Sequence, residues 1–340
     1  AFARGQDRAT GDYNDFWAAR DLLPHLRNVK AAVLLGHGLN DYNVMPSHSV
    51  RIYETLRAMG KPAPLFLHQG GHGGNPPADM VNRWFTHYLY GVDNGVTSEP
   101  TFHVVETNPT PGAPPMRGAT PVAYPAFPAE GTAPVVLRPT GDGNGIASLG
   151  TAPIMSRDTL ADNVAMSGSA LGSAGQSQHG LLYATPILRD TLRISGTPRI
   201  TIRVATNKPA ANLSVWLVTL PYDSTRTGSE GNVGVITRGW ADIQNHRSLT
   251  KGGDYNSLDR GEPLAPGQFY DLTFDLEPDH QVIPPGKQLG VMIMSSDRQF
   301  TLQPQPGTQL TVDLARTTFT IPIVGGLGAL VKAGGFPAVP

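Results

Sequence analysis

An acid and a histidine follow two successive apolar segments near the start of the chain. Asp41 comes shortly after "AAVLLGHG" (31–38), and His72 lies in the glycine-rich stretch that follows "PLFLHQG" (64–70). The carboxyl ends of neighbouring parallel strands meet at one edge of a sheet, where functional side chains gather. An acid followed by a histidine is also the order of the last two members of some nucleophile-acid-histidine triads. There the acid orients the imidazole, and the imidazole moves the nucleophile's proton.

Other interpretations of these residues stay open at the level of the sequence. An Asp after a strand is often only a turn or helix-cap residue. His68, inside the second apolar segment, or His37, just before the acid, could be the active imidazole in place of His72. The glycines at positions 70–74 favour His72, because they let the backbone bend its ring toward the acid.

The segments around Asp41 and His72 alternate between strand and helix patterns. The two apolar segments read as buried strands, and "PSHSVRIYETLRAMG" (46–60) and "ADMVNRWFTHYLYG" (78–91) read as helices. Strands without polar alternation, connected through helices, are typical of a parallel sheet that is covered on both faces. The first part of the chain is therefore predicted to be α/β.

After about residue 110 the pattern changes to strands. A proline-rich stretch (108–134) excludes helix and favours extended chain. "RITIRVAT" (199–206) and "YDLTFDL" (270–276) alternate apolar and polar residues, as half-buried antiparallel strands do. Three further segments continue the pattern, at 212–220, 287–296 and 309–324. A β-sandwich is the expected architecture, and the glycine- and serine-rich stretches 140–150 and 165–180 are expected to be loops.

Composition narrows the function classes. The 26 basic and 27 acidic residues give a formal net charge of −1, which does not suggest a nucleic-acid or anionic-membrane partner. No apolar run approaches the length of a membrane span. The chain has no cysteine, so it offers no disulfide, thiolate metal site or thiol nucleophile. We expect no metal and no cofactor; the compartment stays open, with secretion slightly favoured over the cytoplasm.

Several segments resemble one enzyme family over nearly the whole chain. They are "GDYNDFWAARD" (11–21), "GLNDYNV" (38–44), "LFLHQGGHG" (65–73), "TRGWADIQNHRSL" (237–249) and the long stretch 261–302. Together they resemble the Xaa-Pro dipeptidyl-peptidase family of serine peptidases. Related cocaine-esterase-like and amino-acid-ester hydrolases share the architecture, but they typically have Gly-aromatic-aromatic-Asp where this chain has Gly-Leu-Asn-Asp.

The resemblance implies a fold, an activity and site residues. It implies the C-terminal part of an α/β-hydrolase domain over residues 1–100, followed by a linker and a jelly-roll-like β-sandwich over residues 101–340. It implies cleavage of dipeptides from peptide N-termini with Pro second. Asp41 is then the triad acid and His72 the triad histidine, and Tyr42 and Asn43 are expected to border the substrate.

The nucleophile of such a triad is missing from the chain. In hydrolase chain order the serine precedes the acid, yet the first serine is Ser47, and no G-x-S-x-G elbow occurs. We therefore interpret the chain as the C-terminal part of a larger enzyme, whose upstream segment would carry the serine, the oxyanion donors and the group that grips the substrate's amino terminus. That segment is the expected partner, besides the peptide substrate; a homo-oligomer is left open.

A second class of function is a non-catalytic β-sandwich module that binds carbohydrate. Such a module usually displays exposed aromatic side chains or an acidic calcium loop. The β-rich part has only Trp216 and Trp240, and we expect Trp216 to pack in a core. The acidic residues of 254–263 are expected to form a solvated turn. We expect Trp240 and His246 to lie near the junction with the α/β part.

Overall fold

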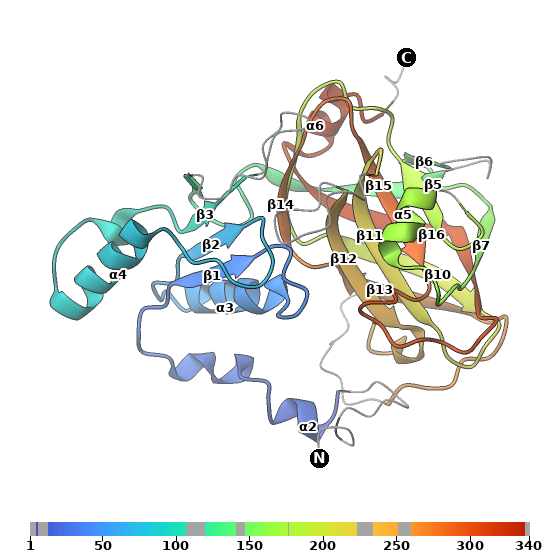
Figure 1. The fold of residues 1–340 in the computed structure, drawn as a ribbon, viewed down its shortest axis with the longest axis horizontal. Helices are drawn as coiled ribbons and strands as arrows, with labels where there is room; N and C mark the ends of the chain where they lie inside the picture. The colour runs from blue at the N-terminus through green and yellow to red at the C-terminus, as the bar shows by residue number, and fades with distance from the viewer. Residues whose placement is uncertain are drawn as a thin grey trace.

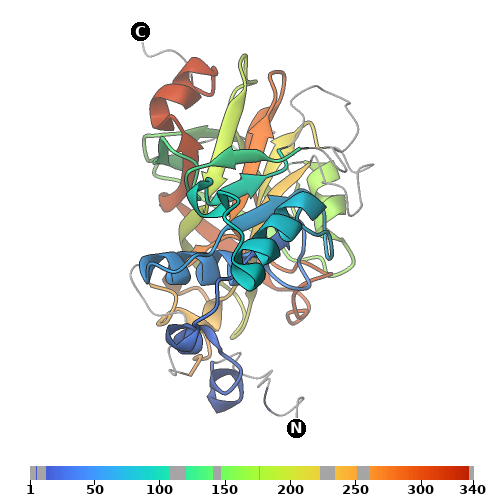
Figure 2. The ribbon, with the colours of Figure 1, turned by 90° about the vertical axis from the view of Figure 1, so that its left-hand side faces the viewer.

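The chain forms two halves that lie side by side (Figure 1). A computed structural model describes residues 5, 13–106, 120–140, 147–175, 177–222, 234–250 and 260–336. Its described residues up to Pro128 are here called the α/β half, and those from Ala129 onward the β half. In Figure 2 the α/β half faces the viewer, with the β half behind it.

The α/β half has the strand and helix order that the sequence predicts. Its elements are α2 (Asp15–Ala18), η1 (Leu23–Asn28), β1 (Leu35–Gly38), α3 (Pro46–Ala58), β2 (Leu65–His68), α4 (Ala78–Tyr90), η2 (Val96–Ser98), β3 (Phe102–Val104) and β4 (Val122–Tyr124). α3 begins with a proline, whose missing N–H costs nothing in a first helical turn. α4 ends at Gly91, which adopts a left-handed φ of 71°.

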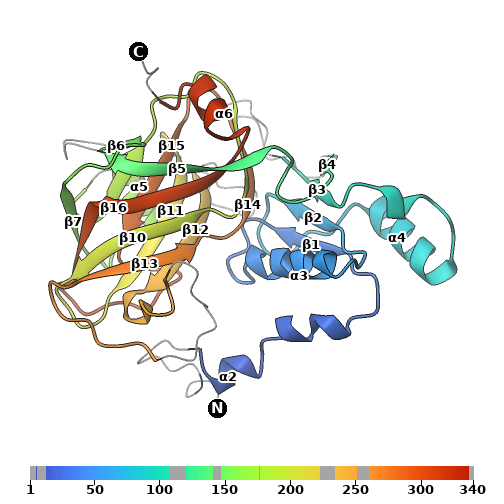
Figure 3. The same ribbon diagram turned by 180° about the vertical axis from the view of Figure 1, so that it is seen from behind.

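The four strands of this half form one sheet in the order β1-β2-β3-β4. β1, β2 and β3 are parallel, and β4 is antiparallel to β3. α3 lies along one face (Figure 3) and buries Val50 and Tyr53 against Leu65, Leu67 and strand β3. β3 and β4 thus join this sheet although they follow residue 100, where we placed the domain boundary; that boundary stays a proposal.

The β half consists of two layers that pack face to face (Figures 1 and 3). Its strands are β5 (Thr132–Thr140), β6 (Ala147–Gly150), β7 (Arg157–Ala161), β8 (Leu181–Ala184), β9 (Leu192–Gly196), β10 (Arg199–Thr206), β11 (Asn212–Leu220), β12 (Val235–Asp242), β13 (Phe269–Asp275), β14 (Asp279–Ile283), β15 (Gln288–Met294) and β16 (Gln309–Val324). One layer contains β10, β13 and β16, the other contains β11, β12 and β15, and β5 pairs with a strand of each. Pairing is antiparallel except between β6 and β8.

The alternation predicted for 199–206 is confirmed in β10. Ile200, Ile202 and Val204 are fully buried, whereas Thr201 and Arg203 are partly exposed. The buried residues belong to a core that also takes side chains from β11 and β15 of the facing layer. The two layers therefore close over a single apolar core, as period-2 burial requires.

Two stretches expected to be loops contain regular structure. Residues 147–150 form strand β6, and residues 168–174 form helix α5 (Gly168–Ala174). The Ser167 side chain caps α5 by accepting a hydrogen bond from Ala170 N, and Leu171 is buried against the β half. Gly168 lies so close to the Trp216 ring that no Cβ would fit there. The small residues that suggested a loop therefore allow close packing. Residues 141–146 and 251–259 lie outside the described residues.

The two halves meet around the carboxylate of Glu106. His280 Nε2 lies 3.1 Å from Glu106 Oε1, Arg193 Nη2 lies 3.3 Å from Oε2, and the Tyr124 hydroxyl donates to Oε1. The hydrogen bond from His280 is the main reason that the pKa of Glu106 falls to about 2, although burial opposes the change. Burial in turn lowers the pKa of His280. We therefore assign a neutral imidazole that donates from Nε2 to Glu106.

The lowered pKa of Glu106 predicts acid sensitivity. A carboxylate whose pKa is depressed on folding contributes stability above its unfolded pKa, here 4.5, and loses it as the pH falls toward about 2. We expect the free energy of unfolding to fall by roughly 3 kcal/mol across this window, measured by urea denaturation. Glu106→Gln should flatten the dependence, and parallel pH curves for the two proteins would contradict this role.

Candidate active site

Asp41 lies in the tight turn that follows β1. Its carboxylate is almost fully buried, and Oδ1 accepts hydrogen bonds of 3.0 Å from the backbone N–H groups of Asn43 and Val44. The Asp41 N–H in turn donates to Gly38 O. These bonds fix the turn, here called the acid loop (residues 39–44), and leave Oδ2 for another partner.

His72 lies in the loop that follows β2, here called the histidine loop (residues 69–74). Two hydrogen bonds join the loops, Asn40 N to Gly70 O at 3.0 Å and Asn40 Nδ2 to Gln69 O at 2.8 Å. A third, from Leu39 N to His68 O at 2.8 Å, joins the acid loop to the end of β2. Gly73 and Gly74 both have positive φ angles, which other residues rarely adopt. The histidine loop can therefore fold back over the end of β1.

The structure brings Asp41 and His72 into contact. His72 Nδ1 lies 2.9 Å from Asp41 Oδ2, and the His72 side chain is 70% exposed while that of Asp41 is 6% exposed. A buried carboxylate against Nδ1 fixes the tautomer that leaves Nε2 free to accept a proton. The pair thus has the geometry of the acid and histidine of a catalytic triad.

The electrostatics of Asp41 keep the carboxylate ionised. Burial by itself raises the pKa of Asp41, but hydrogen bonds from Val44 N–H, His72 and Asn43 N–H outweigh it. The pKa therefore lies below its ordinary value of 3.8. An ionised acid is what stabilisation of an imidazolium requires.

The two alternative imidazoles are engaged elsewhere. His37 Nε2 lies 2.8 Å from Val44 O in the acid loop, and Nδ1 lies 2.7 Å from Ser49 Oγ in α3, so both ring nitrogens have a partner. His68 Nδ1 accepts from Gly70 N–H, and burial lowers the pKa of His68. His68 Nε2 is buried without a hydrogen-bond partner among the described residues. His37 Nε2 approaches Asp41 Oδ2 only to 4.0 Å, against 2.9 Å for His72 Nδ1.

Tyr42 and Asn43 point in different directions from the acid loop. The Tyr42 ring packs against Trp240 and Phe300 of the β half, with centroid distances of 5.9 and 5.7 Å. Asn43 is exposed, and its contact with Asp41 is made by the backbone. Trp240 does lie at the junction, as expected. His246 contacts Glu262 and Tyr270 within the β half.

Ser195, His280 and Glu106 form a second serine-histidine-acid set, which is not a site. His280 Nδ1 lies 3.1 Å from Ser195 Oγ and Nε2 lies 3.1 Å from Glu106. Ser195 and His280 are fully buried at the junction, and Ser195 Oγ also accepts from Ala129 N–H. A nucleophile must reach its substrate. This set therefore holds the two halves together.

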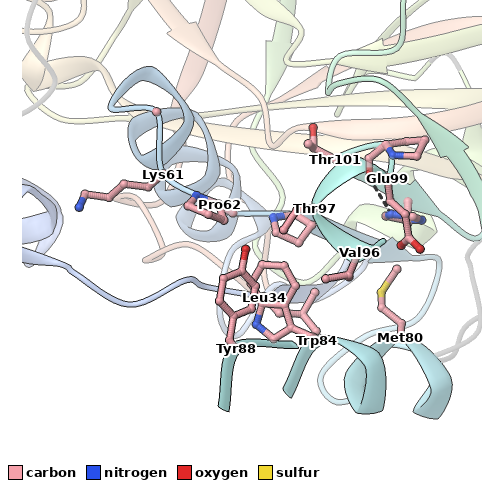
Figure 4. Close-up of a pocket in the computed structure, with 15 residues that line it drawn as sticks. Leu34, Lys61, Pro62, Met80, Trp84, Tyr88, Val96, Thr97, Glu99 and Thr101 are labelled. Carbon is pink, nitrogen blue, oxygen red and sulfur yellow. Dashed lines mark hydrogen bonds between the residues drawn. The ribbon is translucent and has the colours of Figure 1, made fainter. Parts of the chain in front are cut away.

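A pocket of about 240 Å³ lies at the opposite end of the parallel strands (Figure 4). Leu34, Met80, Trp84 and Val96 line it between α4 and the sheet, and neither Asp41 nor His72 takes part. In the described part of the chain, no group of three His, Cys, Asp or Glu side chains could hold a metal ion. Nor does any helix in that part have the length and apolarity needed to cross a membrane.

Two family models match the chain. The X-Pro dipeptidyl-peptidase C-terminal non-catalytic domain matches residues 94–327, and the X-Pro dipeptidyl-peptidase (S15 family) model matches residues 2–74. The chain belongs to the X-Pro dipeptidyl-peptidase family. The second match covers both Asp41 and His72, so the residues in contact here lie inside the peptidase part of the family pattern.

Individual relatives agree with this assignment. A putative Xaa-Pro dipeptidyl-peptidase of Rhodopirellula baltica is 49% identical over 323 residues, covering 94% of this chain and 49% of the relative. The chain spans about half the length of the curated relatives that it matches first.

Solved structures share the fold at low sequence identity. A CocE/NonD family hydrolase from Staphylococcus aureus matches with a TM-score of 0.69 at 15% identity, covering 95% of this chain and 59% of that chain. An α-amino acid ester hydrolase matches with a TM-score of 0.68 at 14% identity, covering 95% and 60%. The likeness shows an α/β-hydrolase-like fold, and together with the family it supports a hydrolase.

Gly38 is the point at which β1 passes under the histidine loop. A substitution there tests how closely the two are packed. A methyl group at Gly38 would overlap the carbonyl oxygens of Gly70 and Gly71, which cannot rotate away as a side chain can. Gly38→Ala should lower the free energy of unfolding by roughly 1–3 kcal/mol, measured by urea denaturation. It should also speed amide exchange at Asn40.

Gly328→Ala is the control for this substitution. Gly328 lies in α6 (Gly326–Lys332) with open space around it, so alanine there should leave stability unchanged or raise it slightly. A Gly38→Ala protein that unfolds at the same urea concentration as the wild type would refute the close packing of the two loops.

Proposed function

We propose that this chain supplies the acid and the histidine of a Ser-Asp-His triad in a peptidase that releases Xaa-Pro dipeptides from peptide N-termini. The observation that carries the proposal is the 2.9 Å contact between Asp41 Oδ2 and His72 Nδ1 at the carboxyl ends of two adjacent parallel strands. Membership of the X-Pro dipeptidyl-peptidase family supports the substrate class.

In this mechanism each residue of the pair has one role. Asp41 holds the His72 ring through Nδ1, so that Nε2 takes the proton from the attacking serine hydroxyl and later gives it to the leaving amine. The lowered pKa of Asp41 keeps its charge available to stabilise the imidazolium that forms between these steps. The exposed His72 ring allows an approaching serine and substrate to reach it.

The serine would come from an upstream segment of the same enzyme. Two features of the α/β half support this partner. Among the described residues β1 pairs only with β2, so one edge of a parallel sheet is bare. On α4, the side chains of Phe85, Leu89 and Tyr90 are 51%, 69% and 79% exposed. An upstream segment that continued the sheet past β1 and covered α4 would pair the bare edge and bury the exposed apolar side chains.

The alternatives have less support. An ester hydrolase of the same architecture shares the fold with this chain, but that likeness lies below 20% identity. A purely binding role for the chain would leave the Asp41–His72 contact without a purpose. We further propose that the β half is jelly-roll-like, and that Asn43, exposed beside the acid, borders the substrate.

The missing nucleophile gives the first test of this function. This 340-residue chain alone should neither hydrolyse an Xaa-Pro chromogenic substrate nor react with a fluorophosphonate, because that reagent needs an activated serine. Labelling is followed by gel fluorescence and intact mass. A labelled 340-residue band would show that the chain holds its own nucleophile, and the proposal of an upstream serine would be abandoned.

The second test addresses the pair itself, in the longer protein that includes the upstream segment. His72→Ala should lower kcat on an Xaa-Pro substrate by about 10⁴ or more, and Asp41→Asn should also be severe, since it favours the wrong imidazole tautomer. Circular dichroism would check that both variants fold. His68→Ala is the matched control and should retain far more activity; the opposite ranking would assign the base to His68.

A further inference from the structure

The residue directly after the triad acid is held by the β half. The Tyr42 ring lies between three side chains of that half: the Arg238 guanidinium is 4.4 Å from its centroid, and Trp240 and Phe300 meet it edge-on. Arg238 also lies 4.2 Å from the Trp216 ring and 4.9 Å from Phe300. A guanidinium buried among aromatic faces is attracted to each of them and excludes water from all.

Asp297 holds this aromatic cluster in shape. Its Oδ2 accepts hydrogen bonds from the indole N–H groups of Trp216 at 2.9 Å and Trp240 at 3.1 Å. Its backbone carbonyl accepts from the N–H of Phe300 at 2.8 Å. One fully buried residue thus positions two of the rings that surround Tyr42, those of Trp240 and Phe300, and also Trp216, which packs on Arg238. The aromatic side chains around Tyr42 are therefore fixed by hydrogen bonds within the β half.

The histidine loop has an anchor of its own in the β half. Gln69, at the start of that loop, donates from Nε2 to His280 O and to Val105 O, both at 3.1 Å. Its Oε1 accepts from Gln281 Nε2 at 2.9 Å. His280 and Gln281 belong to β14, so a single side chain joins the loop that carries His72 to a strand of the other half.

A further hydrogen bond from the β half holds helix α3, which lies between the two loops in the chain. Glu277 of the β half accepts at Oε2 from Ser47 N–H, in the first turn of α3, at 2.9 Å. A carboxylate at this place satisfies a backbone donor that has no partner within the helix, and it faces the positive end of the helix dipole. The β half therefore contacts the acid loop, the helix after it and the histidine loop.

We propose that the β half positions the Asp41–His72 pair through two anchors, Tyr42 and Gln69, which makes both of them positioning residues of the site. Tyr42 fixes the acid loop, whose Asn43 and Val44 N–H groups hold Asp41 Oδ1, and Gln69 fixes the loop that carries His72. The contacts alone place the two loops against the β half. The effect of these contacts on turnover rests on the proposed function.

Amide hydrogen exchange in the 340-residue chain, followed by NMR, tests the loop geometry without any activity. Tyr42→Ala should speed exchange at the amides of Asn43 and Val44 by tenfold or more relative to the wild type. The ¹³Cγ titration of Asp41 should move to higher pH, because the hydrogen bonds that lower its pKa are weakened. Tyr42→Phe keeps the ring and should leave both measurements at wild-type values.

Two further variants separate positioning from general destabilisation. Tyr270→Ala removes a partly buried tyrosine of the β half that packs against His246, away from both loops, and it should leave exchange at Asn43 and Val44 and the titration of Asp41 unchanged. Gln69→Ala, which opens no apolar core, should speed exchange at the Asn40 amide, whose hydrogen bond joins the two loops. Wild-type exchange at all three amides in both Tyr42→Ala and Gln69→Ala would overturn the proposal.

Measurements of kcat and KM in the longer enzyme test whether the two anchors affect turnover. If a shift of about 1 Å separates the pair, Tyr42→Ala should lower kcat by about a hundredfold with little change in KM, and Tyr42→Phe should restore kcat. An enzyme that has no Xaa-Pro activity in the wild type would defeat the proposed function, while the exchange result would still decide whether the β half holds the loops. Unchanged kcat in Tyr42→Ala, alongside altered exchange, would overturn the positioning role.

Discussion

The parallel pairing of β1 with β2 determines where Asp41 and His72 lie. Gly38 pairs with His68 in the last register position, so both strands end at the same level and their loops leave the sheet at one edge. Gly38 has no side chain at the point where the histidine loop crosses it, and the backbone bonds between the loops depend on that closeness. The 2.9 Å contact between Asp41 and His72 follows from this crossing.

Much of this arrangement could be predicted from residue patterns. The strands and helices between residues 31 and 91 have strong local signals, including the proline that begins α3 and the glycine that ends α4. The pairing of Asp41 with His72 follows from strand order. β3, by contrast, is three residues long, which is too short for a periodic signal. Helix α5 depends on the cap at Ser167 and on the space beneath Trp216, and composition alone shows neither.

The supporting residues of the site could not be predicted in the same way. The partners of Tyr42 lie nearly 200 or more positions away, at Arg238, Trp240 and Phe300, and those of Gln69 lie at His280 and Gln281. Such contacts arise only when the two halves dock. His37 resembled a candidate base by position, but only the folded loop shows that Ser49 and Val44 take both of its nitrogens.

Buried charged groups at the junction hold the two halves in one arrangement. Burial raises the pKa of Asp297, so its ionised form depends on the Trp240, Arg238 and Trp216 groups around it. A buried charge that loses its partners costs several kcal/mol. A junction built on Arg238, Asp297 and Glu106 therefore penalises small displacements between the halves. The hydrogen bond between Asp41 and His72 joins two loops that both contact the β half, so restraint at the junction also limits how far these two side chains can move apart.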